Sequence, residues 1–270
     1  MTCFAYWLIQ TRLHRLGRRG LWLLIFSAAV CAAAPAQDIA QTLESPTLLL
    51  DGVLRRHVIS GQVGYRGISM DPQFNAYLME LKQTDAEALP GRADKLVFWI
   101  NAYNALAIQG ILEGYSPSTF FGKVGFFYNK KYRAGGQHIN LYDLEHTILI
   151  PLKEPRIHFS IVCASVSCPG LRSEAYTVMR LEQQLEDNAR RFINDTERNR
   201  FDREKKIAYL SKIFDWFQED FSAHSGSVLK YVAHYIKDPE LARELEAGDY
   251  NIKYLTYDWK LNGTFPKANE

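Results

Sequence analysis

The feature that most constrains the fold is an almost uninterrupted apolar segment from Lys95 to Ile111, with the sequence LVFWINAYNALAIQGI after its first lysine. The segment is long enough for a helix, and apolar residues occur on every side of that helix. A helix that is apolar nearly all round is buried, so we expect this one at the centre of the domain. Asn101 and Asn104 are three residues apart and share one face. Because buried amides need hydrogen-bond partners, they either brace neighbouring backbone or line a site.

The N-terminus has the layout of a secretory signal peptide over residues 1–36. Four arginines precede an apolar run from Leu21 to Ala34, and a small-x-small cleavage signal stands before Gln37. The apolar run has roughly 14 residues, short of the ~20 that a membrane-spanning helix needs. We therefore expect a secreted or periplasmic protein, with a retained anchor as the alternative.

Removal of this segment changes the charge balance and the cysteine content. The whole chain has 32 Lys and Arg against 30 Asp and Glu. Without the four arginines of the signal, 28 basic residues face 30 acidic ones, which gives a net charge of −2. A nearly neutral chain without a basic run offers no electrostatic case for binding nucleic acid. The two cysteines that remain, Cys163 and Cys168, lie in a protein expected in an oxidising compartment.

The rest of the chain indicates one domain of the α+β class. Residues 37–47 are polar and small, and we interpret them as a loose lead-in. Residues 48–270 contain no internal repeat and no linker-like composition, so they are expected to form a single domain. Helical patterns outnumber strand patterns, which predicts a helix-rich domain with a small antiparallel or mixed sheet.

Local signals place several elements within this domain. Asp71-Pro72 opens a helix with a cap residue and a proline at the first position. Residues 124–141 are interpreted as a hairpin with a break at Gly135-Gly136. Ser211 is expected to cap a helix that carries Trp216, and this tryptophan is expected in the core.

Reactive side chains are most concentrated from Arg156 to Leu171, RIHFSIVCASVSCPGL. The stretch begins as a β-branched and aromatic run typical of a buried strand, and it ends in small residues and a Pro-Gly turn. On a strand from Ile157 to Cys163, side chains alternate between faces, so His158 and Cys163 would point to opposite sides. Cys168 lies beyond the turn and can fold back. His158 with Cys168 is therefore the better pairing of base and nucleophile.

Four interpretations of this stretch remain open. A Cys163–Cys168 disulfide needs Cα atoms within about 7 Å, which the intervening turn permits, and the compartment favours it. A thiolate nucleophile would use His158 as its base. A metal site would need a remote His138 or His146, but the C-x4-C spacing lacks the tighter spacing usual for structural zinc. Two free buried cysteines would pack as small hydrophobic side chains. We predict no metal and no cofactor.

The chain resembles a known family in five blocks that occur in the same order: KLVFWINAYNALAI, INLYDLEHTIL, RIHFSIVCASVSCPGL, LSKIFDWFQEDF and YLTYDWKLN. This is the family numbered 547 among domains of unknown function, which occurs in secreted bacterial proteins and, attached to other segments, in plants. The resemblance runs from about Leu48 to Asn262 and implies a single α+β domain. It singles out the positions Asn101, Asn104, Glu145, His146, His158, Cys163, Cys168, Ser211, Trp216, Asp220 and Asp258.

A fainter likeness links the chain to papain- and transglutaminase-type cysteine enzymes, in which a buried helix packs beside a histidine-bearing strand. Such enzymes carry their cysteine at the start of that helix, whereas the helix at Lys95–Ile111 has none. The likeness therefore implies either a cysteine moved to Cys163 or Cys168, or a domain that is no longer a catalyst.

The leading functional interpretation is a secreted or periplasmic domain with a polar cleft around His158 and the Cys163/Cys168 loop. Such a domain would have a structural role or bind a small ligand, an envelope component or a protein, and it would have no stable membrane span after signal removal. The alternative is a thiol-dependent hydrolase or acyl transferase acting on an amide or peptide-like substrate. In the alternative, His158 is the base, Cys168 or Cys163 the nucleophile, and Glu145 or His146 the orienting group. The candidate binding residues are Asn101, Asn104, Ser211 and Asp220.

Overall fold

The computed structural model describes the backbone of residues 37–264, with side chains from Pro46 onward. The predicted signal peptide, residues 1–36, lies outside the described residues. The first helix, α1, runs over Gln37–His57, so the expectation of a loose lead-in at residues 37–47 is wrong. That expectation rested on polarity, but Gln, Ala, Leu and Glu are all good helix formers.

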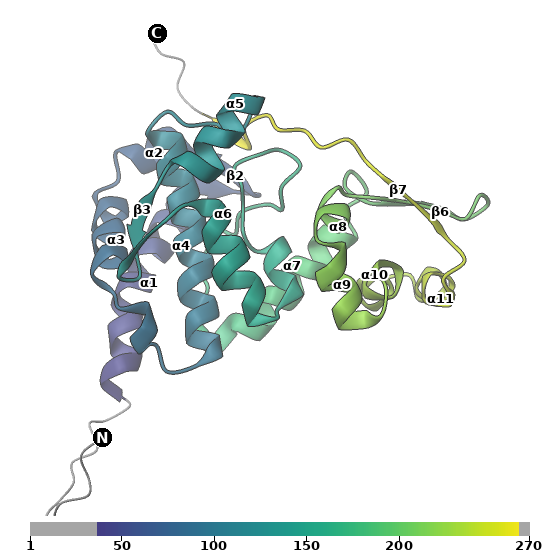
Figure 1. Cartoon of the computed structure of the whole chain (residues 1–270), viewed down its shortest axis with the longest axis horizontal. Helices are drawn as coiled ribbons and strands as arrows, with labels where there is room; N and C mark the ends of the chain where they lie inside the picture. The colour runs from purple at the N-terminus through teal and green to yellow at the C-terminus, as the bar shows by residue number, and fades with distance from the viewer. Residues whose placement is uncertain (1–36, 265–270) are drawn as a thin grey trace, which may run out of the picture. The chain divides into compact units, whose positions relative to one another are not determined.

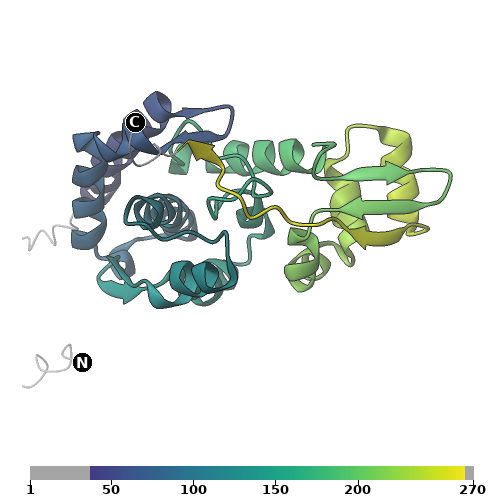
Figure 2. The ribbon, with the colours of Figure 1, turned by 90° about the horizontal axis from the view of Figure 1, so that it is seen from above.

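The centre of the fold is the helix α4, Arg92–Leu112, in which every residue from Leu96 to Ile108 is buried, as the apolar segment predicted. It packs against α1 and against α2, Tyr65–Ser69 (Figure 1). Figure 2 shows α4 end-on with other helices around it. The helix α3, Pro72–Gln83, packs on α1 and begins as predicted, because the Asp71 carboxylate accepts the Gln73 N–H at 3.0 Å.

The remaining helices are mostly short. The longer ones are α7 (Leu181–Ile193), α9 (Gln218–Ser225), α10 (Val228–Tyr235) and α11 (Pro239–Ala247). The short ones are η1 (Ala86–Ala88), α5 (Phe120–Lys123), η2 (Val124–Asn129), α6 (Leu141–Asp143), η3 (Leu144–Leu149), η4 (Ile150–Leu152), η5 (Pro155–Phe159), η6 (Val178–Arg180) and α8 (Ile213–Trp216). Among residues 37–264, no helix combines the length and the apolar character needed to cross a bilayer.

The strands form small sheets, some antiparallel and some mixed, which confirms the predicted α+β class. The first sheet has the order β1 (Val58–Ile59), β2 (Gln62–Gly64), β8 (Gly263–Thr264), with β2 and β8 parallel. The second is the hairpin of β3 (Tyr132–Ala134) and β4 (Gln137–Ile139). The third has the order β5 (Arg200–Asp202), β6 (Ile207–Leu210), β7 (Asn251–Tyr254), with β6 and β7 parallel.

The hairpin is shorter than the expected residues 124–141, because residues 124–129 form η2 instead of a strand. Its turn is the predicted glycine pair. Gly135 and Gly136 both have positive φ, at 60° and 81°. A Cβ at Gly135 would also lie 2.5 Å from the Trp99 ring. Only glycine satisfies both conditions without strain.

The buried apolar residues of the described chain form two clusters. The first surrounds α4, and the second contains residues from α8 to α11 and from the third sheet. Two elements contribute to both. Leu185 of α7 belongs to the first cluster and Phe192 to the second. In the same way, Ile157 and Phe159 of η5 lie in different clusters, so His158 stands between them in sequence.

The expected strand that carries His158 is wrong, because η5 is a 3-10 helix. Glu154 accepts the Arg156 N–H, and Pro155 is the first helical residue. A capping side chain followed by a proline begins a helical turn, and here it overrides the strand-like composition of the residues that follow.

A segment after β7 crosses back to the first sheet and pairs with the cysteine loop on the way (Figure 2). The Val166 N–H donates to the Lys260 carbonyl at 2.8 Å, and the Asn262 N–H donates to the Ala164 carbonyl at 3.1 Å. Loop residues 164–167 are therefore held by the end of the described chain. The fold thus joins the central stretch to residues almost a hundred positions away.

Candidate functional site

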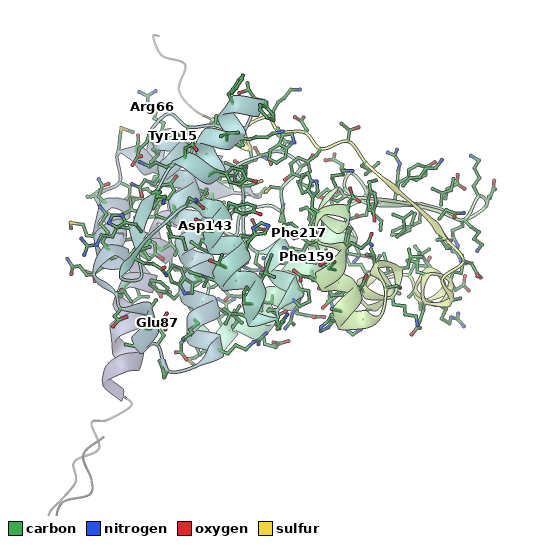
Figure 3. All side chains as sticks on the ribbon, in the orientation of Figure 1. Arg66, Glu87, Tyr115, Asp143, Phe159 and Phe217 are labelled. Atoms are coloured by element: carbon green, nitrogen blue, oxygen red, sulfur yellow. The ribbon has the colours of Figure 1, made fainter. Side chains whose placement is uncertain are left out.

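His158 is a fully buried ring between two carboxylates. Its Nε2 lies 2.8 Å from Asp220 Oδ2, and its Nδ1 lies 3.8 Å from Glu145 Oε1. The ring stacks on Phe217 with centroids 3.8 Å apart. Phe217, which is labelled in Figure 3, also lies 6.2 Å from the ring of His146 on η3. Glu145 belongs to η3 and Asp220 to α9, so the imidazole connects elements of the two apolar clusters.

These carboxylates decide the charge of His158. Burial lowers the pKa of an imidazole, but the hydrogen bond to Asp220 and the nearby Glu145 carboxylate outweigh burial and raise the pKa of His158 above its ordinary value. The two carboxylates therefore favour the protonated form of the ring. His146, the other candidate orienting group, contacts neither carboxylate: its Nδ1 donates to the Tyr142 carbonyl at 3.0 Å, and its ring stacks on Tyr142.

Cys163 and Cys168 are free thiols that lie close together. The Cys163 N–H donates to Cys168 Sγ at 2.9 Å. Cys163 Sγ lies 3.1 Å from Ser165 Oγ and 3.3 Å from the Tyr257 hydroxyl. The Ser165 hydroxyl in turn donates to the Tyr257 oxygen at 3.0 Å. The predicted disulfide is not formed here and stays a prediction, which this proximity supports.

The two thiols differ in acidity. Burial raises the pKa of Cys168, but hydrogen bonds from the Cys163 thiol, the Tyr257 hydroxyl and the Cys163 amide outweigh it and lower the pKa to about 7. Burial and the neighbouring Cys168 thiol raise the pKa of Cys163 well above its ordinary value. A single negative charge in this pair is therefore carried by Cys168.

The expected pairing of base and nucleophile is not assembled. Among the described residues, no hydrogen bond or ion pair joins His158 to either cysteine; the imidazole nitrogens face Asp220 and Glu145. Sequence reasoning paired His158 with Cys168 on the assumption of a strand at Ile157–Cys163, after which the loop can fold back. The turn of η5 sends the ring toward α9 and η3 instead. Within residues 37–264, no group of three or more His, Cys, Asp or Glu is arranged to hold a metal ion.

Both buried amides of α4 hold backbone. Asn104 donates to the Ser160 carbonyl at 3.0 Å and accepts the Val162 N–H at 2.8 Å. Asn101 donates to and accepts from the backbone of Tyr176, each at 2.9 Å. The sequence analysis left open whether these amides brace backbone or line a site, and the contacts are of the bracing kind. They position the segments on both sides of the cysteine loop. A role for these amides in ligand binding stays a prediction.

The remaining singled-out residues, Ser211, Asp258 and Trp216, contact neither His158 nor the two thiols through any hydrogen bond or ring contact of the described residues. Ser211 is buried, and its hydroxyl accepts the Ile213 N–H at the start of α8. Asp258 pairs with the cysteine loop, because its N–H donates to Ser167 Oγ at 2.8 Å. Trp216 is 44% exposed and packs on Tyr257 and Trp259. The expectation that it belongs to the core is wrong, because the side of the short helix α8 on which it lies is left partly uncovered.

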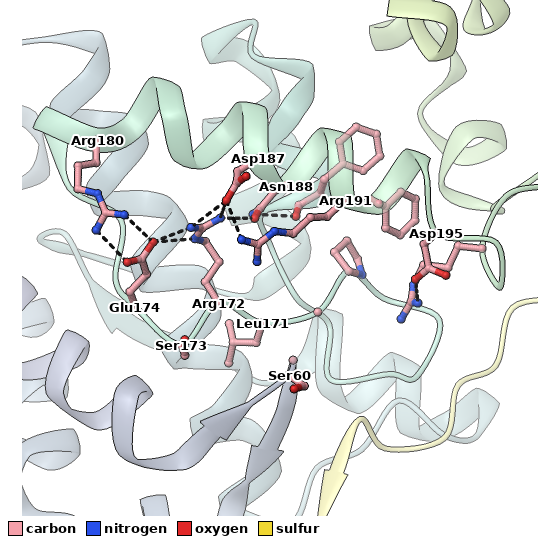
Figure 4. Close-up of a pocket in the computed structure, with 16 residues that line it drawn as sticks. Ser60, Leu171, Arg172, Ser173, Glu174, Arg180, Asp187, Asn188, Arg191 and Asp195 are labelled. Carbon is pink, nitrogen blue, oxygen red and sulfur yellow. Dashed lines mark hydrogen bonds and ion pairs between the residues drawn. The ribbon is translucent and has the colours of Figure 1, made fainter. Parts of the chain in front are cut away.

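Sequence reasoning missed a charged cavity of about 610 Å³ beside the cysteine loop (Figure 4). It borders both parts of the central stretch, since Phe159 follows His158 and Pro169 follows Cys168. Its lining includes four arginines and three acids, which are Arg172, Arg180, Arg191, Arg198, Glu174, Asp187 and Asp195. The available signal was the arginine after the Pro-Gly turn, together with the charged side of α7.

Within the cavity, arginines already neutralise the acids. Glu174 accepts from Arg172 at 2.6 Å and from Arg180 at 2.8 Å. Burial raises the pKa of Glu174, but these two guanidinium groups outweigh it and lower the pKa to about 2. Asp187 accepts from Arg191 at 2.8 Å. Figure 4 shows these side chains converging from α7 and from the segment that precedes η6.

Arg198 connects the cavity to the cysteine loop. Its guanidinium donates to the Cys168 carbonyl at 3.1 Å and to the Val166 carbonyl at 3.0 Å. It also pairs with Asp195. The wall of the cavity and the backbone of the thiol pair are therefore held by one side chain.

Comparison with models of known protein families finds a match over part of the chain. Residues 87–193 match the family described as a protein of unknown function, DUF547. The match confirms the family resemblance and contains three of its five sequence blocks, including α4 and the cysteine loop. The DUF547 description names no activity. No curated protein and no solved structure matches the chain.

Proposed function

We propose that this is a secreted or periplasmic binding domain whose ligand site is the arginine-lined cavity beside the cysteine loop. The ligand is a small molecule that carries a carboxylate or a phosphate. The observation that carries this proposal is the composition of the lining, four arginines against three acids.

In this cavity the acidic side chains are already engaged, and the groups that can still form hydrogen bonds to a ligand are arginine N–H donors. Each acid is engaged by at least one arginine: Glu174 by two, Asp187 by Arg191, and Asp195 by Arg198. Arg191 is 69% exposed, and among the described residues only its Nη2 is hydrogen-bonded, to Asp187. Its other two nitrogens are free to donate. A planar guanidinium matches the geometry of carboxylate and phosphate, so an anion is the ligand class that fits.

The size of the cavity supports a small ligand. About 610 Å³ falls within the range of roughly 300–1,000 Å³ typical of small-molecule sites. The cavity lies next to the stretch for which the polar cleft is predicted, because Phe159 and Pro169 line it, although His158 and the two cysteines do not.

Thermal unfolding with inorganic phosphate and with citrate tests this proposal, with sodium chloride at matched ionic strength as the reference. A ligand that binds the folded state raises Tm. We expect this increase in the wild type and in the control Arg243→Ala, which removes an exposed arginine of α11. We expect a much smaller increase in Arg191→Ala. An equal increase in both variants, or none in the wild type, would contradict the proposal.

The thiol-dependent hydrolase or acyl transferase is a second candidate, and one observation favours it: the pKa of Cys168 is lowered to about 7. Against it stands the absence of a partner base, since His158 faces carboxylates among the described residues. The intact mass of the folded, unreduced protein after iodoacetamide treatment shows whether Cys168 is a reactive thiol. A nucleophile predicts an adduct that Cys168→Ser removes. A mass lower by two hydrogens, without an adduct, shows a closed disulfide and excludes the candidate for that form.

A further inference from the structure

Two phenylalanines stand exposed at the start of α5. Phe120 is 75% exposed and Phe121 is 84% exposed, and their rings touch only edge-to-face at 5.5 Å. The helix has a defined cap, because Thr119 Oγ1 accepts the Gly122 N–H at 3.0 Å. The rings are therefore presented by a fixed turn, at the edge of the molecule in Figure 1.

Further aromatic residues with exposed surface lie next to this pair in the chain. Tyr128 is exposed, and Tyr115 is partly exposed. Tyr115, labelled in Figure 3, packs beside Gly125 of η2. Lys130 Nζ lies 5.5 Å from the centre of the Tyr115 ring, which brings the two ends of residues 115–131 together. We call residues 115–131 the aromatic segment.

The aromatic segment is positively charged. It contains Lys123, Lys130 and Lys131 and no acid; Glu113, just before it, pairs with Lys130. Lys123 lies 3.9 Å above the Trp259 ring, and Lys131 is exposed. This local excess of positive charge contrasts with the net charge of −2 expected for the chain after signal removal.

We propose that the aromatic segment docks on the surface of an anionic lipid bilayer. Phenylalanine enters the boundary between headgroups and acyl chains, tyrosine settles at headgroup depth, and lysine pairs with lipid phosphates. The segment combines all three residue types. This proposal is independent of the ligand cavity.

The small area of the two exposed rings, Phe120 and Phe121, favours a lipid surface over a second protein as the partner. Two aromatic side chains offer roughly 150–250 Å² each, whereas a stable protein interface buries about 800 Å² on each partner. Insertion into a bilayer has no such requirement, because the lipid surrounds the inserted rings.

Vesicle sedimentation of the exported protein tests the proposal. Vesicles of phosphatidylglycerol and phosphatidylethanolamine are compared with vesicles of phosphatidylcholine alone. We expect binding to the anionic vesicles, weakened about tenfold for each ring removed in Phe120→Ala/Phe121→Ala. Lys131→Glu should weaken binding further at low salt. The matched control, Met70→Ala/Met179→Ala, removes two exposed apolar side chains elsewhere and should bind as the wild type does.

Three results would overturn the proposal. The first is no binding to anionic vesicles. The second is equal binding by the double phenylalanine variant, which would show that another part of the chain contacts the lipid. The third is concentration-dependent dimerisation in sedimentation velocity that the same variant abolishes, which would identify a second copy as the occupant. Because both rings are exposed, the variant should keep the Tm of the wild type, and this is measured alongside.

Discussion

Replacement of Asp220 by asparagine examines whether His158 is a buried cation held between two carboxylates. Asp220 Oδ2 lies 2.8 Å from Nε2, and the Asp220 side chain is 26% exposed. A hydrogen bond between charged groups contributes about 1.5–3 kcal/mol, and partial exposure favours a value near 2 kcal/mol. In a domain of 150–250 residues this corresponds to a decrease in Tm of about 4–8 °C.

The decrease should depend on pH. Because the pKa of His158 is raised in the folded protein, its stabilising contribution is fully present below the ordinary value of 6.5. It is lost as the pH rises through the folded value. The Tm difference between wild type and Asp220→Asn is therefore expected to be largest near about pH 6 and to shrink toward about pH 9.

Calorimetric unfolding across this pH range measures the effect. Glu219→Gln is the matched control, because Glu219 is the exposed neighbour of Asp220 on α9 and should change Tm little at any pH. A decrease of equal size at every pH would refute the reasoning, since it would mean that the imidazole does not change its protonation state in this pH range. So would an unchanged Tm in Asp220→Asn.

Two further substitutions test the framework of the site. Asn104→Ala removes two buried hydrogen bonds to backbone, so the free energy of unfolding in urea should fall by about 2–4 kcal/mol; an unchanged midpoint would show that Asn104 does not brace the segment. Glu174→Gln should lower the stability of the folded protein, because the pKa of Glu174 is lowered to about 2. A lowered pKa stabilises above the ordinary value of 4.5 and ceases to do so as the pH falls toward 2, so Tm should decrease at neutral pH and match the wild type at the acid end.

The elements that sequence reasoning predicted well are those whose signals are local. The segment Lys95–Ile111 is apolar on every side, which leaves burial as its only solution, and α4 is the centre of the fold. Asp71-Pro72 specifies a helix start through its own side chain and ring, and α3 begins there. The glycine pair specifies the turn of the hairpin because it tolerates positive φ.

The errors arose where a local pattern supports two outcomes. The β-branched residues after Pro155 suit a strand, but Glu154 and Pro155 start a helical turn that redirects His158. Trp216 lies on a helix whose one other aromatic residue, Phe214, is buried, and no pattern on α8 reveals that one side stays partly open.

The cavity was out of reach for a different reason. Its lining runs from Ser60 to Arg198, and its arginines matter only because the fold brings α7 against the segment after the cysteine loop. Paired arginines and acids are also ordinary on a solvent-exposed helix. Only the three-dimensional arrangement shows that Arg191 keeps donors to spare beside a cavity.

Calorimetric titration of citrate into the purified protein tests the central claim most directly. The account predicts binding at one site in the wild type and in Arg243→Ala. It predicts an affinity lower by at least about tenfold in Arg180→Ala/Arg191→Ala, because each tenfold corresponds to about 1.4 kcal/mol and each lost charged hydrogen bond contributes about that much. Equal affinity in the double variant, or no heat of binding in the wild type, would contradict the account.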